Sequence, residues 1–577
     1  MVIDETAKFS ANVIAPLNEV GDTVGCTYVD QHTIKTPTGF KEAYEQYNEG
    51  GWQGLSYPEE FGGQGMPQSM SLLHAEILAT ACWSWNMYPG LSKGAINTLY
   101  AHGSDELKEK YMHRMVSGEW TGTMCLTEPQ CGSDLAQVST KAIPQPDGTY
   151  KITGTKIFIS CGEHDMTNNI IHCVLARLPD APPGIKGISL FLVPKHKVSD
   201  SGEIDTEFNG ANIGRIEDKM GCHGSSTCEI NFEDAEGYLI GTEHKGMAHM
   251  FTFINTSRLG TSMQGVAAAE NSYQNALAYC KDRRSMRALN GTIDEKSFAD
   301  PLIVHGDIRK NLLFQRAVSL GGRSMIYQCV QMADEMVAAK FENNDMKRHD
   351  EIDYELGFKT PILKGFLTEM GVEAASLGMQ LYGGHGYIKS NKQEQIYRDV
   401  RISSIWEGTT GIQALDLLGR KIFDKKEKLK PIKDAVARLK NFVKPHLFAN
   451  SVVGQHARTL YWKAIQWDLM TMAIGYKAMK GSKDIVGSVS VDYLLYSGHV
   501  TLAEHWFRME LVSHEKLAAG TGNPDYYKAQ IQTSDYVFKH MLPRTLALRQ
   551  SILSPSDATV NSSGALKAEH FSFDHSL

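Results

Sequence analysis

The sequence predicts an α+β protein in which an N-terminal helical domain, an antiparallel β domain, a helix bundle and an additional C-terminal helical domain follow one another. Three observations predict this order. Helical patterns occur before residue 121 and after residue 245, short strand-like runs fill residues 121–245, and turn sequences separate those runs. With 577 residues, the chain is long enough for about three or four domains with cores of their own.

The first domain is expected over residues 1–120. Helical stretches alternate there with glycine and proline, as in GGWQGLSYPEEFGGQGMP at residues 50–67, and this punctuation is typical of turns. The domain is therefore predicted to be mostly helical.

The middle domain is expected over residues 121–245. Its strand-like runs are YKITGTKIFIS, NNIIHCVLARL, GISLFLVPK and CEINFED, and sequences such as PDGT and PPGIKG separate them. Short strands joined by turns indicate an antiparallel β domain.

A helix bundle is expected over residues 246–420. Its clearest stripe of apolar residues has steps of four and three throughout: Leu363, Leu367, Met370, Ala374, Leu377 and Leu381. Gly383 and Gly384 follow in QLYGGHGY, and glycine commonly ends a helix. Capping is therefore the first interpretation of these two glycines.

Residues 421–577 are expected to add a C-terminal helical domain. This part opens with the charged stretch DKKEKLKPIKD and continues with helical stripes such as Trp462, Ile465, Leu469 and Met472. The last two dozen residues are rich in serine and have little periodic apolar content. They are expected to form a disordered tail or an arm on a neighbouring subunit.

Charge and composition exclude several classes of protein. A net charge of -8 and a pI near 6.2 argue against a general affinity for nucleic acid, which depends on clustered Lys and Arg. No apolar run approaches the about 20 residues that span a bilayer. The start, MVIDETAKFS, lacks the basic and then apolar order of a signal peptide. A cytoplasmic protein with no nucleic-acid or membrane partner is expected.

The 10 cysteines contain no CxxC pair, and Cys222, His223 and Cys228 come nearest to a cluster. Buried thiols in a reduced cell are favoured there over a metal site. His223 is expected to be a hydrogen-bonded imidazole in a β turn.

Glu407 is the first candidate functional residue. It stands in WEGTTGIQALDLLGRK, residues 406–421, just before a helical pattern. Taken alone, a carboxylate there is favoured by the helix dipole by about 0.3–1 kcal/mol, which is a structural role. The segment LTEPQCGSD, in which Gly132 allows close approach of the backbone, is likewise interpreted as an ordinary loop when it is considered alone.

Four segments together resemble the acyl-CoA dehydrogenases: MCLTEPQCGSD, KIFIS, QLYGGHGY and WEGTTG. The resemblance covers about residues 1–420. The long C-terminal extension, with GTKIFISCGEHD and KMGCHGSSTC, is most similar to the 3-methylthiopropionyl-CoA (methylmercaptopropionyl-CoA) dehydrogenases. Relative to those, the chain begins late, and an N-terminal helical piece is expected to be absent or trimmed.

The resemblance implies an FAD-dependent enzyme that forms a trans α,β double bond in an acyl-CoA. Glu407 then removes the α-proton, flavin N5 takes the β-hydride, and the N–H of Glu407 with a ribityl hydroxyl holds the thioester oxygen. Burial beside an acyl chain is expected to raise the pKa of Glu407 above its usual value.

The resemblance also implies which residues bind FAD. Thr127 faces the pyrimidine edge of the flavin, and Gly132 and Ser133 lie where flavin and CoA meet. Phe158 stands where an indole is usual, and the hydroxyl of Ser160 approaches N5. For KIFIS the alternative is an ordinary strand with an inward Phe.

Further residues are implied to bind the adenine and pyrophosphate half of FAD across a subunit interface: Arg283, Gln380, Gly383 and Gly384. A guanidinium suits pyrophosphate because of its forked donors. Two alternatives stay open. Arg284 could be the residue that contacts the pyrophosphate, or Arg283 could be a solvated charge on its helix. Thr409 and Thr410 match a further flavin-contacting turn.

The substrate is implied to contact Asn255 and Arg258 in INTSRLG, together with Ser133, Glu407 and Gly408. An Asp is frequent in the family where Asn255 stands, and Arg258 is alternatively a structural ion-pair residue. His223 stands where many relatives carry Arg, and no catalytic role is assigned to it.

Electron-transfer flavoprotein is the expected electron acceptor. A flavin site shared across an interface implies a homodimer or a homotetramer. Two alternatives stay open, a noncatalytic DNA-associated flavoprotein on the same scaffold and an acyl-CoA oxidase. The acidic net charge disfavours the first, and the sequence does not decide the second or the acyl chain length.

Overall fold

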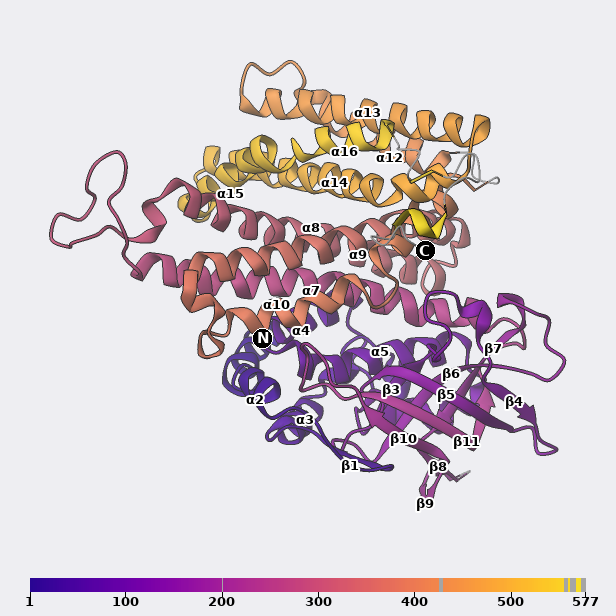
Figure 1. Cartoon of the computed structure of the whole chain (residues 1–577). Coiled ribbons are helices and arrows are strands. Elements are labelled where there is room, and N and C mark those ends of the chain that lie inside the picture. The colour runs from indigo at the N-terminus through magenta and orange to yellow at the C-terminus, as the bar shows by residue number, and fades with distance from the viewer. Residues whose placement is uncertain (200, 425–428, 555–558, 561–566, 572–577) are drawn as a thin grey trace. The chain divides into compact units, whose positions relative to one another are not determined.

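The computed structural model describes residues 1–199, 201–424, 429–554, 559–560 and 567–571 (Figure 1). The chain divides into two compact units. The first comprises residues 1–271 and 386–403, and the second comprises residues 272–385 and 404–577. Among the described residues, no helix combines the length and apolar character required to cross a lipid bilayer.

The first unit begins with helices, as predicted. They are α1 Val2–Phe9, α2 Leu17–Val24, α3 Phe40–Glu49, α4 Gln68–Ala81, α5 Trp83–His102 and α6 Asp105–Val116. Ser104 caps α6, because its side chain accepts a hydrogen bond from the N–H of Leu107. Large aromatic residues of these helices, such as Tyr44, Trp85 and Tyr88, are fully buried and form the core.

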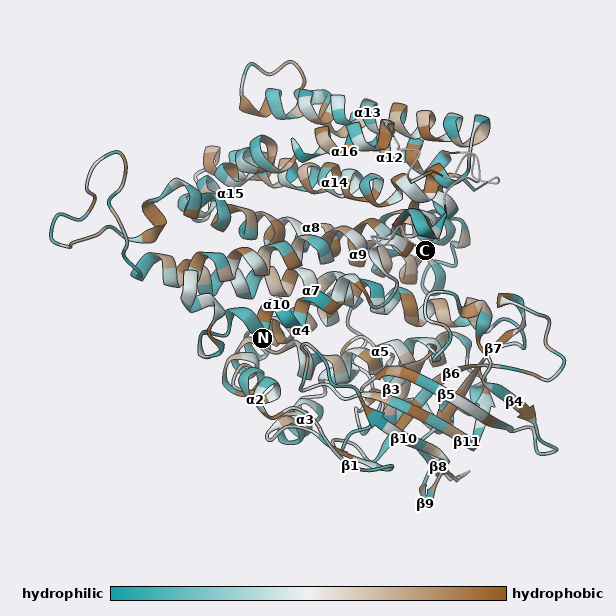
Figure 2. Ribbon diagram, viewed as in Figure 1, coloured by the Kyte–Doolittle hydropathy of each residue, from teal (hydrophilic) through white to brown (hydrophobic). Residues whose placement is uncertain are grey.

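A seven-stranded sheet follows, in the order β10-β11-β5-β4-β6-β3, with β7 pairing with β11 and β6. The strands are β3 Trp120–Cys125, β4 Lys141–Pro144, β5 Tyr150–Ser160, β6 Asn169–Arg177, β7 Ile188–Pro194, β10 Ala211–Ile216 and β11 Thr227–Leu239. Strand β6 is almost continuously apolar and buried (Figure 2). Two small ribbons accompany the sheet, β1 Thr27–Asp30 with β2 Thr33–Lys35, and β8 His196–Val198 with β9 Ile204–Phe208.

Most strand pairs of the sheet are antiparallel, in agreement with the predicted β domain. At one side, however, β3 and β4 pair with β6 in parallel. A parallel pair requires a long connection, and the chain between β3 and β6 provides one. The strand WTGTMC of β3 was not among the predicted runs.

The second unit is helical. Helix α7, Gly246–Asp282, begins in the first unit and ends in the second. The other helices of the second unit are α8 Gly306–Phe341, α9 Met346–Tyr382, α11 Thr410–Leu415, α12 Lys430–Val443, α13 Val452–Lys480, α14 Asp484–Ala518, α15 Pro524–Tyr536 and α16 Arg544–Leu553. Helix α10, Gln393–Arg401, belongs to the first unit.

The predicted stripe on α9 lies largely in the interior, where Leu363, Leu367 and Leu381 are buried, and Gly383 ends the helix with a φ of 60°. The capping prediction for Gly383 is confirmed. The expectation for the C-terminal tail falls mostly outside the described residues. The domain boundaries at residues 120, 245 and 420 stay a proposal.

Helix α14 lies between α13 and α8 in the second unit (Figure 1). The indole N–H of Trp506 donates to the carbonyl of Ala317 on α8 at 3.0 Å. The fully buried carboxylate of Glu510 pairs with His456 Nδ1 at 2.8 Å and accepts from Ser534 Oγ at 2.7 Å. One carboxylate therefore joins α13, α14 and α15.

Replacing Glu510 with alanine is expected to lower the free energy of unfolding by about 3 kcal/mol, because a buried imidazole and a buried hydroxyl both lose their acceptor. A fall in the thermal unfolding midpoint measures the effect. Glu515→Ala, an exposed position on the same helix, is the control and is expected to change the midpoint little. Equal midpoints for the two variants would contradict the proposed role of Glu510.

Candidate active site

The segment Leu126–Asp134 is a loop that follows β3 in the first unit. The N–H of Ile157 on β5 donates to the carbonyl of Thr127 at 2.9 Å, and Lys156 Nζ donates to the carbonyl of Leu126 at 3.1 Å. The loop is thereby fixed to β5.

A buried ion pair fixes the loop further. Lys156 Nζ lies 2.7 Å from Glu128 Oε1, and both side chains are at most 1% exposed. Ser139 and Thr140 each donate a backbone N–H and a hydroxyl to the same carboxylate. Burial raises the pKa of Glu128, but the ammonium of Lys156 and these hydrogen bonds outweigh it and lower the pKa to about 2. Glu128 is therefore ionised at neutral pH.

The outer side of this loop is open. Gly132 and Ser133 are exposed, and a Cβ placed on Gly132 would meet only the Thr127 methyl group, at 3.7 Å. Phe158, at the end of β5, is 59% exposed and has a φ of 58°. A bulky residue rarely takes this conformation, and such outliers gather at ligand sites. The alternative of an inward Phe in an ordinary strand is excluded.

A bulge in β5 accounts for the orientation of Phe158. Ile159 pairs with Cys228 of β11, whereas Lys156 pairs with Ile230, so that β5 has one residue more than its partner between these pairs. Bulges change the direction of a side chain and are common beside active sites. Ser160, half-buried, pairs with Thr227 beyond the bulge.

The candidate substrate residues of the first unit lie on α7. Asn255 is exposed, whereas Arg258 is only 7% exposed. Thr256, beside Asn255, accepts a hydrogen bond from Asn97 of α5 at 3.2 Å. Burial favours the structural role that the sequence left open for Arg258, and Asn255 stays the better candidate for contact with a ligand.

In the second unit, Glu407 lies in a turn that leads into α11. Glu407 is half-buried and has a φ of 55°, and Gly408 has a φ of 90°. Lys364 Nζ donates to the carbonyl of Gly408 at 2.6 Å, and Gln413 Nε2 donates to the carbonyl of Glu407 at 3.0 Å. The main chain of the turn is thus held at both residues.

The turn also shows that Glu407 is not the cap of α11. Thr409 is the N-cap and accepts from the N–H of Ile412 at 3.3 Å, and the hydroxyl of Thr410 donates to Glu369 at 2.5 Å. Glu407 stands two residues before this cap. The N-cap of α11 is therefore Thr409 and not Glu407.

Arg283, Gln380, Gly383 and Gly384 lie at one end of the helix pair α7 and α9, and all four are exposed. The rings of Tyr279 on α7 and Tyr382 on α9 stack at 4.0 Å and hold the two helix ends together. Arg284, the alternative partner, forms an ion pair with Asp294 at 2.8 Å. The structure therefore favours Arg283 as the guanidinium available to an anionic ligand.

Sequence reasoning missed three residues that support these sites. Lys156 and Glu128 lie inside the singled-out segments, but only their neighbours were given roles. Lys364 is fully buried in the apolar stripe of α9, and a lone lysine in such a stripe was the available signal.

His223 and the cysteines behave as predicted. The two ring nitrogens of His223 lie within hydrogen-bond distance of the carbonyl oxygens of Asp22 and Lys219, at 3.0 and 2.7 Å. Cys222 and Cys228 are buried, and burial raises the pKa of both thiols well above the usual value.

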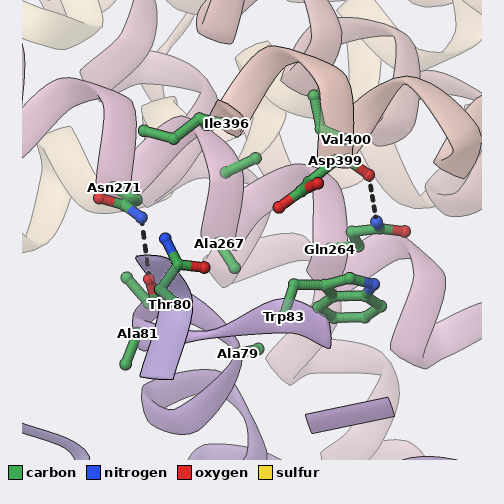
Figure 3. Close-up of a pocket in the computed structure, with 12 residues that line it drawn as sticks. Ala79, Thr80, Ala81, Trp83, Gln264, Ala267, Asn271, Ile396, Asp399 and Val400 are labelled. Carbon is green, nitrogen blue, oxygen red and sulfur yellow. Dashed lines mark hydrogen bonds between the residues drawn. The ribbon is translucent and has the colours of Figure 1, made fainter. Parts of the chain in front are cut away.

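A cavity of about 30 Å³ lies elsewhere in the first unit, between α4, α7 and α10 (Figure 3). Asn271 Nδ2 donates to the carbonyl of Thr80, and Gln264 Nε2 donates to the carbonyl of Asp399. The cavity has room for a water-sized molecule and is too small for a nucleotide cofactor.

Burial raises the pKa of Asp399 to about 6, against the hydrogen bond from the N–H of Cys222 and the charge of Arg398. The ionised form is therefore disfavoured in the folded protein. Stability that is present below the unfolded pKa of about 3.8 is lost as the pH rises through about 6. Asp399→Asn does not titrate, so its stability relative to the natural protein is expected to rise by about 2 kcal/mol between pH 4 and 7.

Thermal unfolding midpoints of both proteins across this pH range measure the change. Asp180→Asn, at an exposed position, is the control. A difference between Asp399→Asn and the natural protein that stays constant with pH would contradict the assignment.

Family models match consecutive parts of the chain. They are described as the N-terminal domain of acyl-CoA dehydrogenase at residues 1–119, its middle domain at 123–235, its C-terminal domain at 244–422, and an acetyl-CoA dehydrogenase C-terminal-like domain at 431–562. The chain belongs to the acyl-CoA dehydrogenase family, and the predicted resemblance is confirmed.

Among relatives, the chain is 37% identical to 3-methylmercaptopropionyl-CoA dehydrogenase of Ruegeria pomeroyi, over 97% of this chain and 93% of that protein. It is 32% identical to a broad-specificity linear acyl-CoA dehydrogenase of Mycobacterium tuberculosis, over 90% and 86%. The fold is similar to that of an acyl-CoA dehydrogenase complexed with FAD from Bacillus anthracis, with a TM-score of 0.76, 20% identity, and coverage of 96% and 88%.

Proposed function

We propose that the protein is an FAD-dependent acyl-CoA dehydrogenase in which Glu407 is the catalytic base. The observation that carries the proposal is the turn at Glu407, whose carboxylate is half-buried and whose main chain is fixed by Lys364 and Gln413. A base acts efficiently only when it is positioned for the proton that it removes.

The residues present fit FAD. Gly132, Ser133 and the exposed ring of Phe158 offer small, polar and aromatic contacts to a flavin, and Thr127 and Ser160 flank them along the chain. At the ends of α7 and α9, exposed Arg283 with Gln380, Gly383 and Gly384 offers a forked cation and uncrowded backbone. A forked cation suits a pyrophosphate.

The protein's own groups then act as follows. Glu407 accepts the α-proton of the thioester, and its N–H donates to the thioester oxygen on which negative charge develops. Gly408, with its φ of 90°, gives the turn its shape, and Thr409 and Thr410, which continue it into α11, would contact the flavin. Ser133, Asn255 and Arg258 are the proposed CoA contacts, of which Asn255 is exposed. When bound, FAD supplies the acceptor for the β-hydride.

We propose 3-methylthiopropionyl-CoA, or another short or medium acyl-CoA, as substrate. The identity to the Ruegeria pomeroyi enzyme over nearly the whole chain supports this choice. Electron-transfer flavoprotein is the proposed acceptor, a homodimer or homotetramer the proposed assembly, and the cytoplasm the proposed location.

Anaerobic bleaching of the purified flavin by a panel of acyl-CoAs tests the proposal. Methylthiopropionyl-CoA is expected to bleach the flavin fastest, ahead of butyryl-CoA and longer or branched chains. If none of the panel bleaches the flavin, the dehydrogenase assignment fails. Oxygen consumption that matches turnover would instead indicate an acyl-CoA oxidase.

A further inference from the structure

Helix α13 has an apolar stripe on its outer face. Trp462 is 62% exposed, Leu469 56%, Met472 40%, Tyr476 60% and Met479 80%. Large apolar side chains are normally exposed singly, and a continuous row of them marks an interaction surface. The sequence predicted the helix at this stripe, and the structure shows that the stripe does not face the core.

The opposite face of α13 is already used. Its apolar residues, namely Leu460, Ala464, Trp467, Met470 and Ile474, are buried, and α13 packs against α12, α14 and α16. Among the described helices of the second unit, α13 lies at the edge in Figure 1, and hydrophobic residues appear along its length in Figure 2. The helix is therefore apolar on two faces, and only one of them is buried against described residues.

The spacing of the exposed stripe indicates what covers it. Trp462, Leu469 and Tyr476 are seven residues apart, and so are Ile465, Met472 and Met479, each three residues further along. This is the a and d pattern of a heptad repeat, which keeps a narrow seam facing one partner helix. A helix that only lines a globular core has a wider and less regular stripe.

We propose that the exposed stripe of α13 packs against the same stripe of a second copy of this chain, with the two helices antiparallel. In an antiparallel heptad pair, each a residue lies level with a d residue. Such layers form when the two-fold axis passes midway between residues 469 and 472 of each helix. The layers are then Trp462 with the partner's Met479, Leu469 with the partner's Met472, and Tyr476 with the partner's Ile465. Each layer combines a large side chain with a flexible or branched one.

The flanks of the stripe are compatible with this register. Asp468 lies level with the partner's Ala473, and Gln466 lies level with the partner's Gly475, so that no like charges meet and small residues allow close approach. Two-fold symmetry repeats every contact, as expected for an isologous interface.

The exposed area is sufficient for a weak but specific interface. The exposed parts of the stripe residues amount to about 600 Å² per copy, so that two copies would bury about 1,200 Å², the lower end of specific interfaces. A lipid surface is the less favoured occupant of the stripe. A helix that lies on a membrane has a strongly charged face opposite its apolar face. In α13 the face opposite the exposed stripe is instead buried in the second unit.

Leu469→Glu and Met472→Lys, each made in the full-length protein, test the proposal. Light scattering after size exclusion is expected to show that each substitution alone halves the mass of the assembly, because charges are placed in an apolar layer. An equimolar mixture of the two variants is expected to recover the original mass, because the two introduced charges then face each other across the interface. Val512→Glu and Met346→Lys, at exposed positions on α14 and α9, are the matched controls and are expected to leave the mass unchanged.

Circular dichroism and flavin content verify that the variants are folded. Unchanged mass in both stripe variants would overturn the proposal. Loss of the larger assembly without recovery in the mixture would overturn the antiparallel register. Unchanged mass combined with flotation of the natural protein, but not of Leu469→Glu, on phosphatidylserine vesicles would assign the stripe to lipid instead.

Discussion

Replacing Glu407 with glutamine is expected to abolish flavin bleaching by acyl-CoA while leaving the protein folded and loaded with FAD. Glutamine has nearly the same shape and cannot accept the proton, and loss of a general base typically lowers the rate by about 10²–10⁴-fold. The hydrogen bonds that hold the turn use the carbonyls of residues 407 and 408, which the substitution leaves in place. Stopped-flow absorbance under anaerobic conditions measures the rate.

Glu351→Gln, at an exposed position on α9, is the matched control and is expected to bleach at the natural rate. Glu407→Asp shortens the side chain by one methylene and is expected to retain part of the activity. Bleaching of Glu407→Gln at the natural rate would exclude Glu407 as the base, whatever the substrate.

Replacing Lys156 with methionine is expected to lower the free energy of unfolding by about 3–5 kcal/mol, because the Glu128 carboxylate would stay buried without its counter-charge. The loop after β3 would also lose the hydrogen bond from Lys156 to the carbonyl of Leu126. The purified variant is therefore expected to have a lower unfolding midpoint and less than the full FAD content.

Adding Glu128→Gln to the Lys156 variant is expected to recover part of the midpoint, because it removes the unpaired charge. Lys141→Met, at an exposed position on β4, is the control. A Lys156→Met protein with a natural midpoint and full FAD content would show that the ion pair does not hold the loop.

The sequence predicted the order of helical and β segments because each kind of segment has its own periodicity. The stripe through Leu363, Leu367 and Leu381, with its steps of three and four, is an example of the helical periodicity. The sequence did not predict the parallel pairing of β3, because pairing between distant strands leaves no mark on local spacing. The sequence also did not predict that one apolar face of α13 is exposed, because a helix with apolar residues on two faces has the pattern of a buried helix.

The candidate site was predictable where short segments carried the resemblance, as at Glu407 and Phe158. The supporting contacts were not. Lys364 reaches the turn from another helix, and the bulge that turns Phe158 outward depends on the register with β11. Both depend on tertiary structure, which periodicity does not encode.

The turn before α11 is held at residues 407 and 408 through their carbonyl oxygens, which accept hydrogen bonds from Gln413 and Lys364. These two contacts do not depend on which side chain stands at position 407. Asparagine and glycine tolerate the left-handed backbone of this position and could accept the same two hydrogen bonds at their carbonyls. The chemistry at this position could therefore be exchanged, in evolution or by design, while both carbonyl contacts are kept.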